Sequence, residues 1–315
     1  MSNRATTGTL NVGHLRAGSA IIGGMSLPIT AGKVYYVKGG NGSDSNSGRS
    51  WAKAFATLQK FADVAEDYDV CYVRGAVSGA NYGRIVESVV PDATKASRYV
   101  TIIGAGPMDR AVGWKSDAAS SPCLTLNYKG WNIRNFYFEA PTGSAGIKAV
   151  RTSTLDASDF VVEDCEFYTG AYGIQLAGAP HAWRVRRCKF RGITTSTAGI
   201  TPGCIVCTDT ANSVPLAPQI EDCWFLDSKN GVIVPMKDGL VKHNVFQAVG
   251  HSITMTTKLD LRTIGGSADN SAYNMVTKNV MTGTYSEAGG YYESGTGDTW
   301  YDNDISSGKT STLPA

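Results

Sequence analysis

The sequence carries little charge for its length and no long hydrophobic run. Of its 315 residues, 18% are charged, and 29 Lys and Arg nearly balance 27 Asp and Glu, for a net charge of +2. So small a net charge gives no reason to expect a nucleic-acid partner. No run of 18 apolar residues occurs, so the sequence predicts no membrane-spanning helix and no membrane partner.

Signals for export and for a disulfide framework are also missing. The first 18 residues lack a basic segment followed by an apolar one, so a secretory signal peptide is not expected. Seven cysteines are an odd number in a long chain of this kind, which favours reduced thiols made in a cytoplasm. No cofactor and no metal site are predicted.

Helical stripes are scarce, whereas one six-residue phrase recurs. Its pattern is an apolar residue, two polar or charged residues, Cys or Asn (Phe in the first copy), any residue, and Phe or another apolar residue. Its copies are Ile133–Phe138, Val162–Phe167, Val185–Phe190, Ile220–Phe225, Val241–Phe246, Val276–Met281 and Trp300–Ile305. The phrase is stable while the spacing varies, which indicates fixed strands joined by loops of varying length.

A second phrase lies between these copies and alternates with the period of a strand. It reads GIKAV from residue 146, GIQLA from 173, GCIVC from 203, GVIVP from 231 and HSITM from 251. Each unit therefore reads as three strands, with a one- or two-residue corner between two of them. Without helices or hairpin turns between the strands, the units must stack as a solenoid of parallel strands with a continuous apolar core.

The ends of the chain differ from the repeats. Residues 70–76, 99–106 and 123–127 are expected to form the earlier rungs, for nine or ten in all. Helical spacing of apolar residues predicts a capping helix over 51–68. Residues 1–33 are expected to form an extended arm that attaches to a particle or partner, and 306–315 a flexible tail, on either side of a solenoid domain at 34–305.

Two columns follow from stacking the first phrase. Its fourth position holds Cys or Asn, which predicts a ladder at a corner in the left-handed conformation rather than a metal site, because stacked thiols lie in a row. Its second position alternates in charge, which predicts a ladder that sets the register of the strands. The ladder residues are Cys165, Cys188, Cys223, Asn244, Asn279 and Asn303 in one column, and Arg134, Glu163, Arg186, Glu221 and Lys242 in the other.

The segment 34–63, with its Tyr-Val, Gly-x-Asp and Phe-x-Thr-Leu-Gln-Lys elements, followed by a Val-rich strand at 69–75, resembles the pectin-lyase-like superfamily. The repeated phrases extend that resemblance to residue 305. It implies an all-β, right-handed, single-stranded parallel β-helix with an N-terminal helical cap. The arm preceding such a domain is similar to tailed-phage virion proteins, tailspikes and head decorations among them. That likeness implies a homotrimer, with residues 1–33 bound to other virion proteins.

Candidate binding residues come from two sets. The outward positions of the second phrase are taken as Lys148, Gln175, Ile205, Ile233 and Thr254, and the two Ile residues suggest a trimer interface. Five aromatic residues form either a carbohydrate platform or a cap on the C-terminal end of the core. These are Trp224, Tyr291, Tyr292, Trp300 and Tyr301.

No catalytic residue is predicted. The acids of the repeated phrase have basic neighbours on adjacent rungs, so an acid pair is sought only in the insertions, at Asp209, Asp260 and Asp269. The expected function is that of a non-catalytic phage virion protein, a trimeric decoration or spike located on the virion. The alternative is a tailspike depolymerase, a polysaccharide lyase or glycosidase that degrades host surface glycan.

Overall fold

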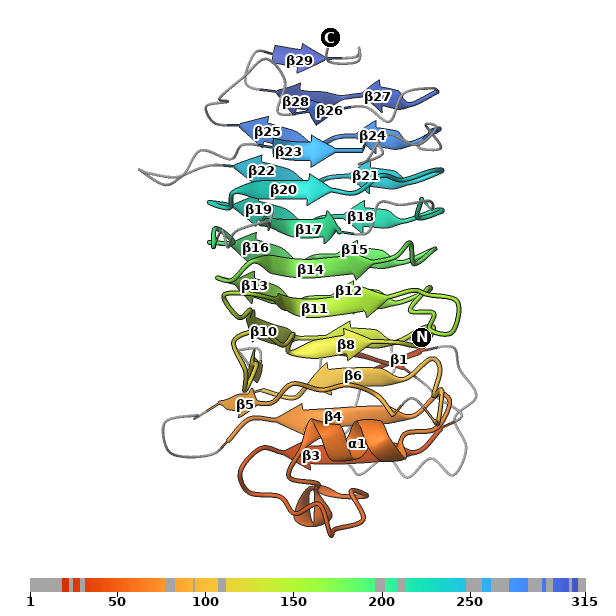
Figure 1. Cartoon of the computed structure of the whole chain (residues 1–315), viewed down its shortest axis with the longest axis vertical. Helices are drawn as coiled ribbons and strands as arrows, with labels where there is room; N and C mark the ends of the chain where they lie inside the picture. The colour runs from red at the N-terminus through yellow and green to blue at the C-terminus, as the bar shows by residue number, and fades with distance from the viewer. Residues whose placement is uncertain are drawn as a thin grey trace, which may run out of the picture.

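A right-handed parallel β-helix forms the body of the molecule, with its rungs stacked along one long axis (Figure 1). The computed structural model describes residues 19–22, 25–28, 32–76, 83–92, 94–106, 112–195, 202–208, 214–247, 257–261, 272–282, 291–292, 297–305 and 308–310. The predicted all-β class and the three-strand unit are confirmed. No helix within these ranges is long and apolar enough to cross a membrane.

Three sheets run along the axis, and neighbouring rungs pair in parallel. Sheet 1 contains β3 (Val34–Lys38), β4 (Val70–Arg74), β6 (Thr101–Gly104), β9 (Asn132–Arg134), β12 (Val161–Glu163), β15 (Arg184–Arg186), β18 (Gln219–Glu221), β21 (Leu240–Lys242), β24 (Met275–Thr277) and β27 (Thr299–Tyr301). Sheet 2 contains β5 (Arg84–Val86), β7 (Val112–Lys115), β10 (Phe136–Glu139), β13 (Glu166–Tyr168), β16 (Lys189–Arg191), β19 (Trp224–Leu226), β22 (Val245–Gln247), β25 (Val280–Thr282), β28 (Asn303–Ile305) and the antiparallel β29 (Gly308–Thr310). Sheet 3 contains β8 (Leu124–Leu126), β11 (Ala145–Val150), β14 (Tyr172–Ala177), β17 (Gly203–Cys207), β20 (Asn230–Ile233), β23 (Thr257–Asp260) and β26 (Tyr291–Tyr292).

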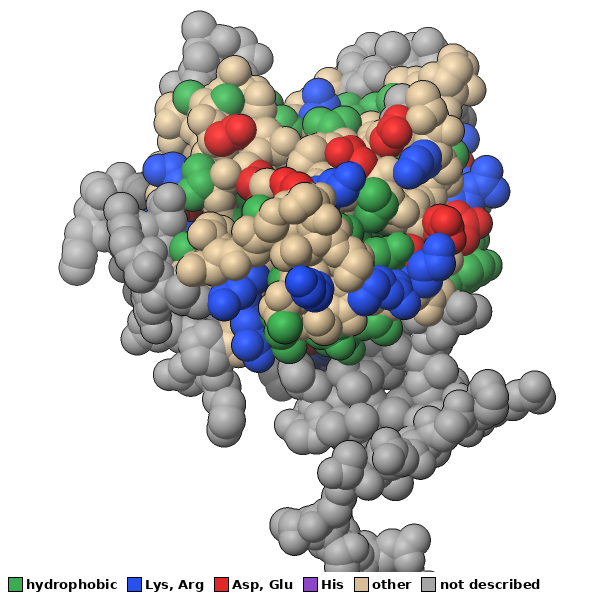
Figure 2. Space-filling view, turned by 90° about the horizontal axis from the view of Figure 1, so that it is seen from below, with side chains coloured by type: hydrophobic (Ala, Val, Ile, Leu, Met, Phe, Trp, Pro, Cys, Tyr) green, Lys and Arg blue, Asp and Glu red, His purple; other side chains and the backbone are tan. Residues whose placement is uncertain are grey.

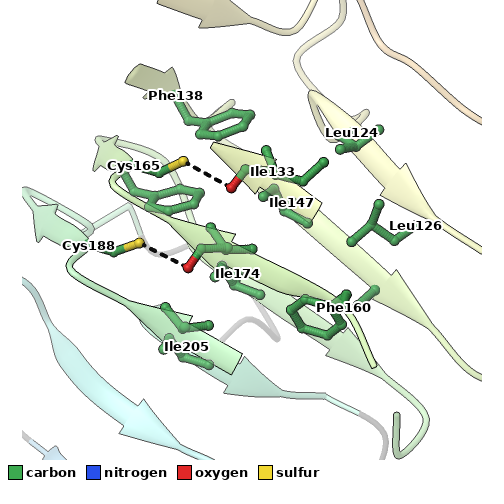
Figure 3. Packing of buried hydrophobic residues seen from close by; sticks show 14 of the residues in the cluster. Leu124, Leu126, Ile133, Phe138, Ile147, Phe160, Cys165, Ile174, Cys188 and Ile205 are labelled. Carbon is green, nitrogen blue, oxygen red and sulfur yellow. Dashed lines mark hydrogen bonds between the residues drawn. The ribbon is translucent and has the colours of Figure 1, made fainter. Parts of the chain in front are cut away.

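The core is a set of inward columns that run from rung to rung (Figure 3). The Phe of the repeated phrase forms the largest column, in which Phe138, Phe167, Phe190, Phe225 and Phe246 stack with ring centroids 4.6–5.1 Å apart. Each of these rings is fully buried. Parallel strands about 4.8 Å apart match the spacing of stacked rings, so the same residue type is favoured on successive rungs.

The corner between sheets 1 and 2 turns through one residue in the left-handed conformation. That residue is the third of the phrase: Asn135, Asp164, Arg187, Asp222, His243, Lys278 and Asp302 all have φ between 51° and 59°. The prediction that the Cys/Asn column supplies this conformation was therefore wrong by one position. A positive φ at the third residue turns the chain so that the fourth residue points inward, where its side chain bonds to the backbone.

The asparagines of the fourth position hold consecutive rungs together. Asn279 Oδ1 accepts from the backbone N–H and the Nδ2 of Asn244, both at 3.0 Å. Asn279 Nδ2 donates to Val241 O and to Asn303 Oδ1, also at 3.0 Å. A buried amide group is stable only when its hydrogen-bonding atoms have partners, and these partners are in reach only in the observed strand register. The asparagine ladder therefore fixes the stacking of the C-terminal rungs.

Cysteines take the same position on the middle rungs. Cys165 Sγ donates to Glu163 O at 3.2 Å and to Ile133 O at 3.8 Å, and Cys188 and Cys223 make the equivalent pairs of contacts. Figure 3 shows the bond to the preceding rung for Cys165 and Cys188. All seven cysteines are free and buried. Among the described residues no His, Cys, Asp and Glu cluster is placed to hold a metal ion. The row of thiols is therefore part of the corner.

The charged residues of the second position pair across the rungs as a column on the outer side of sheet 1. Glu163 lies between Arg134 and Arg186 in the strand register, and Glu221 lies between Arg186 and Lys242. Glu163 is 1% exposed and contacts Arg134 at 3.1 Å, Arg187 at 3.7 Å and Arg186. Glu221 contacts Lys242 at 3.1 Å. A buried carboxylate with three guanidinium neighbours is tied to one register, because any slip leaves its charge unpaired.

A second left-handed corner leads into sheet 1, two residues before each strand. Its column consists of Tyr68, Tyr99, Gly130, Asp159, Ala182, Ala217, Asp238, Tyr273 and Gly297, all with positive φ. Backbone N–H groups of this column donate to the carbonyl that precedes the same corner on the next rung, as from Tyr68 to Arg98 at 3.0 Å. The repeated phrases do not predict this corner, because the corner residues share no side-chain type.

The cap at the N-terminal end is shorter than the predicted helix over 51–68. A 3-10 turn covers Trp51–Lys53, and α1 covers only Leu58–Val64, beside β3 in Figure 1. Phe55 pairs with Val37 as an extension of sheet 1, which prevents one continuous helix. Asp44 accepts from the N–H groups of Ala56 and Thr57, and Glu87 accepts from those of Leu58 and Gln59, at 2.9–3.1 Å.

These two carboxylates and the Thr57 hydroxyl, which accepts from Lys60 N at 3.1 Å, satisfy the free amides at the start of α1. Burial raises the pKa of Glu87, and the neighbouring charges of Asp44 and Asp117 raise it further. Seen along the axis, the N-terminal end mixes basic, acidic and polar side chains with small hydrophobic patches (Figure 2).

The two chain ends depart from simple extended segments. Within the predicted arm, β1 (Ser19–Ile22) and β2 (Met25–Pro28) form an antiparallel pair that joins none of the three sheets. Within the predicted tail at 306–315, β29 pairs with β28, so this part of the tail is ordered as a strand. Residues 32 and 33 are also described, and the remaining residues of the arm and the tail lie outside the described ranges.

Candidate functional site

The outer face of sheet 2 gathers aromatic and charged side chains. In each three-residue strand of this sheet the middle residue, usually Phe, points into the core, so the flanking residues point outward. On β10, β13, β16 and β19 these outward residues form what we call the sheet 2 face: Tyr137, Glu139, Glu166, Tyr168, Lys189, Arg191, Trp224 and Leu226. Four successive rungs therefore present one continuous surface.

Ion pairs and rings on this face contact one another across the rungs. Arg191 Nε lies 2.7 Å from Glu166 Oε1, and its guanidinium carbon lies 4.8 Å from the centre of the Tyr168 ring. Tyr168 and Tyr137 have ring centres 6.2 Å apart. On the rung before, Arg84 Nη2 lies 2.6 Å from Glu139 Oε1. These contacts hold the rings and the carboxylates in fixed orientations before any ligand arrives.

Trp224 extends the face toward the C-terminal rungs. It is the most exposed Trp in the described chain at 52%, and it stands in the outward column after Lys189. Tyr168, at 37%, is also among the exposed large side chains. An exposed indole beside a lysine and a Tyr–Arg pair offers apolar ring surface together with hydrogen-bond donors, which is a combination suited to sugars.

The two glutamates of this face are both engaged in ion pairs. Glu139 contacts Arg84, and Glu166 contacts Arg191. A carboxyl group that serves as a general acid usually lies away from positive charge, whereas each of these lies beside an arginine. Tyr137 is the titratable group with a shifted pKa here: burial raises its pKa, and Glu139 raises it further.

Of the five predicted carbohydrate residues, Trp224 alone is placed on this face. Trp300 is 3% exposed and belongs to the core, so its assignment as a sugar ligand was wrong; it caps the core instead. Tyr301 points outward on sheet 1, where its hydroxyl lies 3.6 Å from the sulfur of Met275. The side chains of Tyr291 and Tyr292 lie outside the described set.

The remaining residues of the face were missed because columns were drawn only at the second and fourth positions of the phrase. Tyr137, Glu139, Glu166, Tyr168 and Arg191 occupy the fifth and seventh positions, on either side of the Phe. The signal was present in the sequence as Tyr-Phe-Glu, Glu-Phe-Tyr, Lys-Phe-Arg and Trp-Phe-Leu on successive copies. Stacking these triplets puts aromatic and charged residues side by side.

The predicted trimer residues divide between the core and the outside of sheet 3. Ile205 is fully buried and pairs with Ile174 in the inward column (Figure 3), so its outward assignment was wrong. Gly203 pairs with Tyr172 rather than Gly173, and this one-residue shift moves Val206 to the outward side. Lys148, Gln175, Val206 and Ile233 form the outward column, in which Ile233 is 8% exposed.

Other candidates fall on residues that the structure does not describe. Asp209, Asp269 and Thr254 lie outside the described ranges, and of Asp260 only the backbone pairings with Ile233 and Tyr292 are described. The strand predicted at residues 251–255 also lies outside these ranges, and β23 at Thr257–Asp260 pairs with β20 in sheet 3. No catalytic pair is therefore assigned to the insertions.

Solved structures of carbohydrate-acting enzymes share this architecture. A pectate lyase from Bacillus sp. N165, solved with trigalacturonate, aligns with a TM-score of 0.58 and 15% identity over 89% of this chain and 84% of its own. A lacto-N-biosidase from Eubacterium ramulus aligns at 0.58 and 12% identity, over 86% of this chain and 55% of its own. A pectin methylesterase from Aspergillus niger aligns at 0.53 and 12% identity, over 91% and 92%.

These similarities establish the fold and no more, since the identities are far below those that carry an activity. No protein-family model matches the sequence. No curated protein matches it either. The residues of the sheet 2 face are therefore the basis for a proposed function.

Proposed function

We propose that this protein binds a polysaccharide along the sheet 2 face and does not cleave it there. The observation that carries the proposal is the row of exposed rings, Tyr168 and Trp224, flanked by the Arg191–Glu166 pair on adjacent rungs. A polysaccharide is a repeating ligand, and a solenoid repeats its outward side chains every ~4.8 Å. Similar folds that act on polysaccharides support the same class of ligand.

The finer proposal concerns where such binding takes place. The protein acts as a surface decoration or spike of a tailed-phage virion, with residues 1–33 attached to other virion proteins and the β-helix facing outward. The β1–β2 pair supports this view, because it pairs only with itself among the described strands and so adds nothing to the solenoid sheets. A homotrimer remains part of the proposal; Ile205 takes no part in it.

A depolymerase is the second candidate, favoured by one specific observation. Glu139 and Glu166 lie on neighbouring rungs and on diagonal outward columns of the same face. Two carboxylates facing one ligand are the minimum for glycoside hydrolysis. Their separate pairing with Arg84 and Arg191 argues for the binding role, because both carboxylates are already engaged with a neighbouring side chain.

One experiment tests both. Bacterial capsular and O-antigen polysaccharides, with polygalacturonate, are screened for binding to the wild-type protein and to Trp224→Ala. Loss of one stacking ring, at ~1.4 kcal/mol, is expected to weaken binding about tenfold. Tyr301→Ala, an aromatic change on sheet 1, is the matched control and should leave the affinity unchanged.

Equal affinity of Trp224→Ala and wild type for every bound polysaccharide would refute the sheet 2 face as the binding surface. The same samples are assayed for new reducing ends and for unsaturated sugars. Sustained release of either, lost in Glu139→Gln and Glu166→Gln, would establish the depolymerase instead.

A further inference from the structure

Three exposed tyrosines in the corner that leads into sheet 1 occupy a conformation that their side chains disfavour: Tyr68, Tyr99 and Tyr273. The first two lie on neighbouring rungs. Tyr68 has φ of 67° and Tyr99 has φ of 57°. A bulky residue in the left-handed region costs roughly 1–2 kcal/mol. Gly130, Asp159 and Ala182 serve the same corner on later rungs, so the turn itself does not require an aromatic residue.

Burial does not offset this cost. Tyr68 is 47% exposed and Tyr99 is 42% exposed, more than most large apolar side chains of the molecule. Strained residues that the fold does not need are found mainly at binding and catalytic positions. Both tyrosines are therefore candidates for a ligand contact.

The two rings form one preformed aromatic surface. Their centres lie 5.3 Å apart with planes 7° from parallel. The Tyr99 ring also lies against the backbone of Gly130, where a Cβ atom would overlap it. The stack of Tyr68, Tyr99 and Gly130 thus fixes the ring planes relative to the solenoid.

An open depression of about 410 Å³ is formed by the segments of chain that lead to these two tyrosines. Ala65, Glu66, Asp67 and Lys95 line it. Glu66 and Asp67 directly precede Tyr68, and Lys95 belongs to the loop that leads to Tyr99. The depression and the aromatic stack are consequently formed by the same two segments of chain.

Hydrogen bonds hold both segments in place. Asp69, 1% exposed, accepts from Lys33 N at 2.6 Å and from Glu66 N at 2.8 Å. Asp67 Oδ1 accepts from Arg98 N at 2.8 Å, which ties the first segment to the second. A site whose backbone is fixed in this way loses little conformational entropy when a ligand binds.

The charges around the depression balance. Glu66 pairs with Lys33 at 2.7 Å, and the Lys33 contact, followed by the charge of Lys95, lowers the pKa of Glu66. Asp67 and Lys95 contribute one charge of each sign. A charged ligand gains nothing here, whereas hydroxyl groups find both donors and acceptors.

We infer that the Tyr68–Tyr99 stack and the depression formed by the same segments are a second site, for a neutral saccharide. A pyranose ring presents C–H groups that pack on an aromatic face, and hydroxyl groups that bond to carboxylates and ammonium groups. The site lies in a different corner of the solenoid from the sheet 2 face. It stands independently of the proposed function.

The test uses substitutions that separate a ligand contact from a structural role. Asn is the residue that best tolerates the left-handed conformation after Gly, so Tyr68→Asn and Tyr99→Asn remove the rings and relieve the strain. The probes are cellotetraose, maltotetraose and N,N′,N″,N‴-tetraacetylchitotetraose, observed by saturation-transfer NMR with the full-length protein. Asp159→Asn, in the same corner, is the control.

We expect wild type and Asp159→Asn to bind at least one probe, and both tyrosine variants to bind it at least tenfold more weakly. Their urea midpoints should equal or exceed that of wild type. Failure of wild type to bind any of the three sugars would overturn the inference. A lowered urea midpoint in the Asn variants, or an unchanged sugar affinity, would do the same. Trp224→Ala should retain probe binding, which separates this outcome from that of the sheet 2 face.

Discussion

Reversing the charge of Arg186 perturbs the ion pairs of Glu163, the most buried carboxylate among the described ion pairs. The Glu163 side chain is 2% exposed, and Arg186 is one of three guanidinium groups around it. Arg186→Glu would place a third acid in the column, directly between Glu163 and Glu221. The new carboxylate faces like charge on both neighbouring rungs.

The cost follows from burial. Breaking a fully buried pair costs ~3–5 kcal/mol. The Arg186 side chain is 38% exposed, so solvent screens part of the interaction, and Arg134 and Arg187 still contact Glu163. We therefore expect a loss of about 3 kcal/mol in the free energy of unfolding. With an unfolding entropy of ~2.1 cal/mol/K per residue, this lowers Tm by about 4–5 °C.

Thermal melting and urea unfolding measure the effect, with Lys278→Glu as the control. Lys278 is an exposed residue of the corner between sheets 1 and 2, and its substitution makes the same change in net charge. Exposed substitutions of this kind change stability by less than ~0.5 kcal/mol. Equal melting temperatures for wild type and Arg186→Glu would refute a charge column that fixes the register.

Three further changes test other parts of the solenoid. Asn279→Ala removes four hydrogen bonds from the buried ladder, and at ~1 kcal/mol each it should lower the free energy of unfolding by about 3–4 kcal/mol in urea titrations; a loss below ~1 kcal/mol would contradict the ladder. His181 Nδ1 accepts from Leu216 N at 3.0 Å, and burial, followed by the charge of Arg151, lowers the pKa of His181 from 6.5. The unfolded chain then takes up the proton first, so stability should fall as pH drops below 6.5 and through the folded pKa, and His181→Gln should flatten this dependence; identical pH profiles would count against it. Burial raises the pKa of Cys204 to about 12, and all seven thiols are buried, so Ellman's reagent should report fewer than one thiol in the native protein and seven in urea, whereas rapid native labelling would exclude the buried columns.

Much of the fold followed from the sequence because a stacked solenoid repeats its chemistry. Phe167, Phe190 and Phe225 each had to meet the same residue on the next rung, and this made the phrase visible despite variable loops. Register within the second phrase was harder. In the structure, GCIVC pairs with the strands on both neighbouring rungs one residue out of the alignment that the phrases suggest. This shift reversed the inward and outward sides for Ile205.

Less of the sheet 2 face was predictable from the sequence. Trp224 drew attention as a lone aromatic residue, whereas Tyr168 and Arg191 acquire their significance only by contact between rungs. The residues of the corner that holds Tyr68 and Tyr99 share a backbone conformation but no side-chain type. Because Gly, Ala, Asp and Tyr all adopt this positive φ, the residue type does not reveal the conformation. A repeat search by side chain cannot detect such a column.

The two carboxylates that bind the start of α1 make the two ends of the solenoid different. Asp44 comes from the loop before the helix, and Glu87 comes from a later rung, so the cap is fastened from both sides of its own sequence. Rungs of a solenoid normally depend on their nearest neighbours alone, and either end can unravel. Here the end next to the arm opens only if residues 44 to 87 separate together, so its rungs do not unfold one at a time. We therefore expect unwinding by heat or by force to begin at the opposite end.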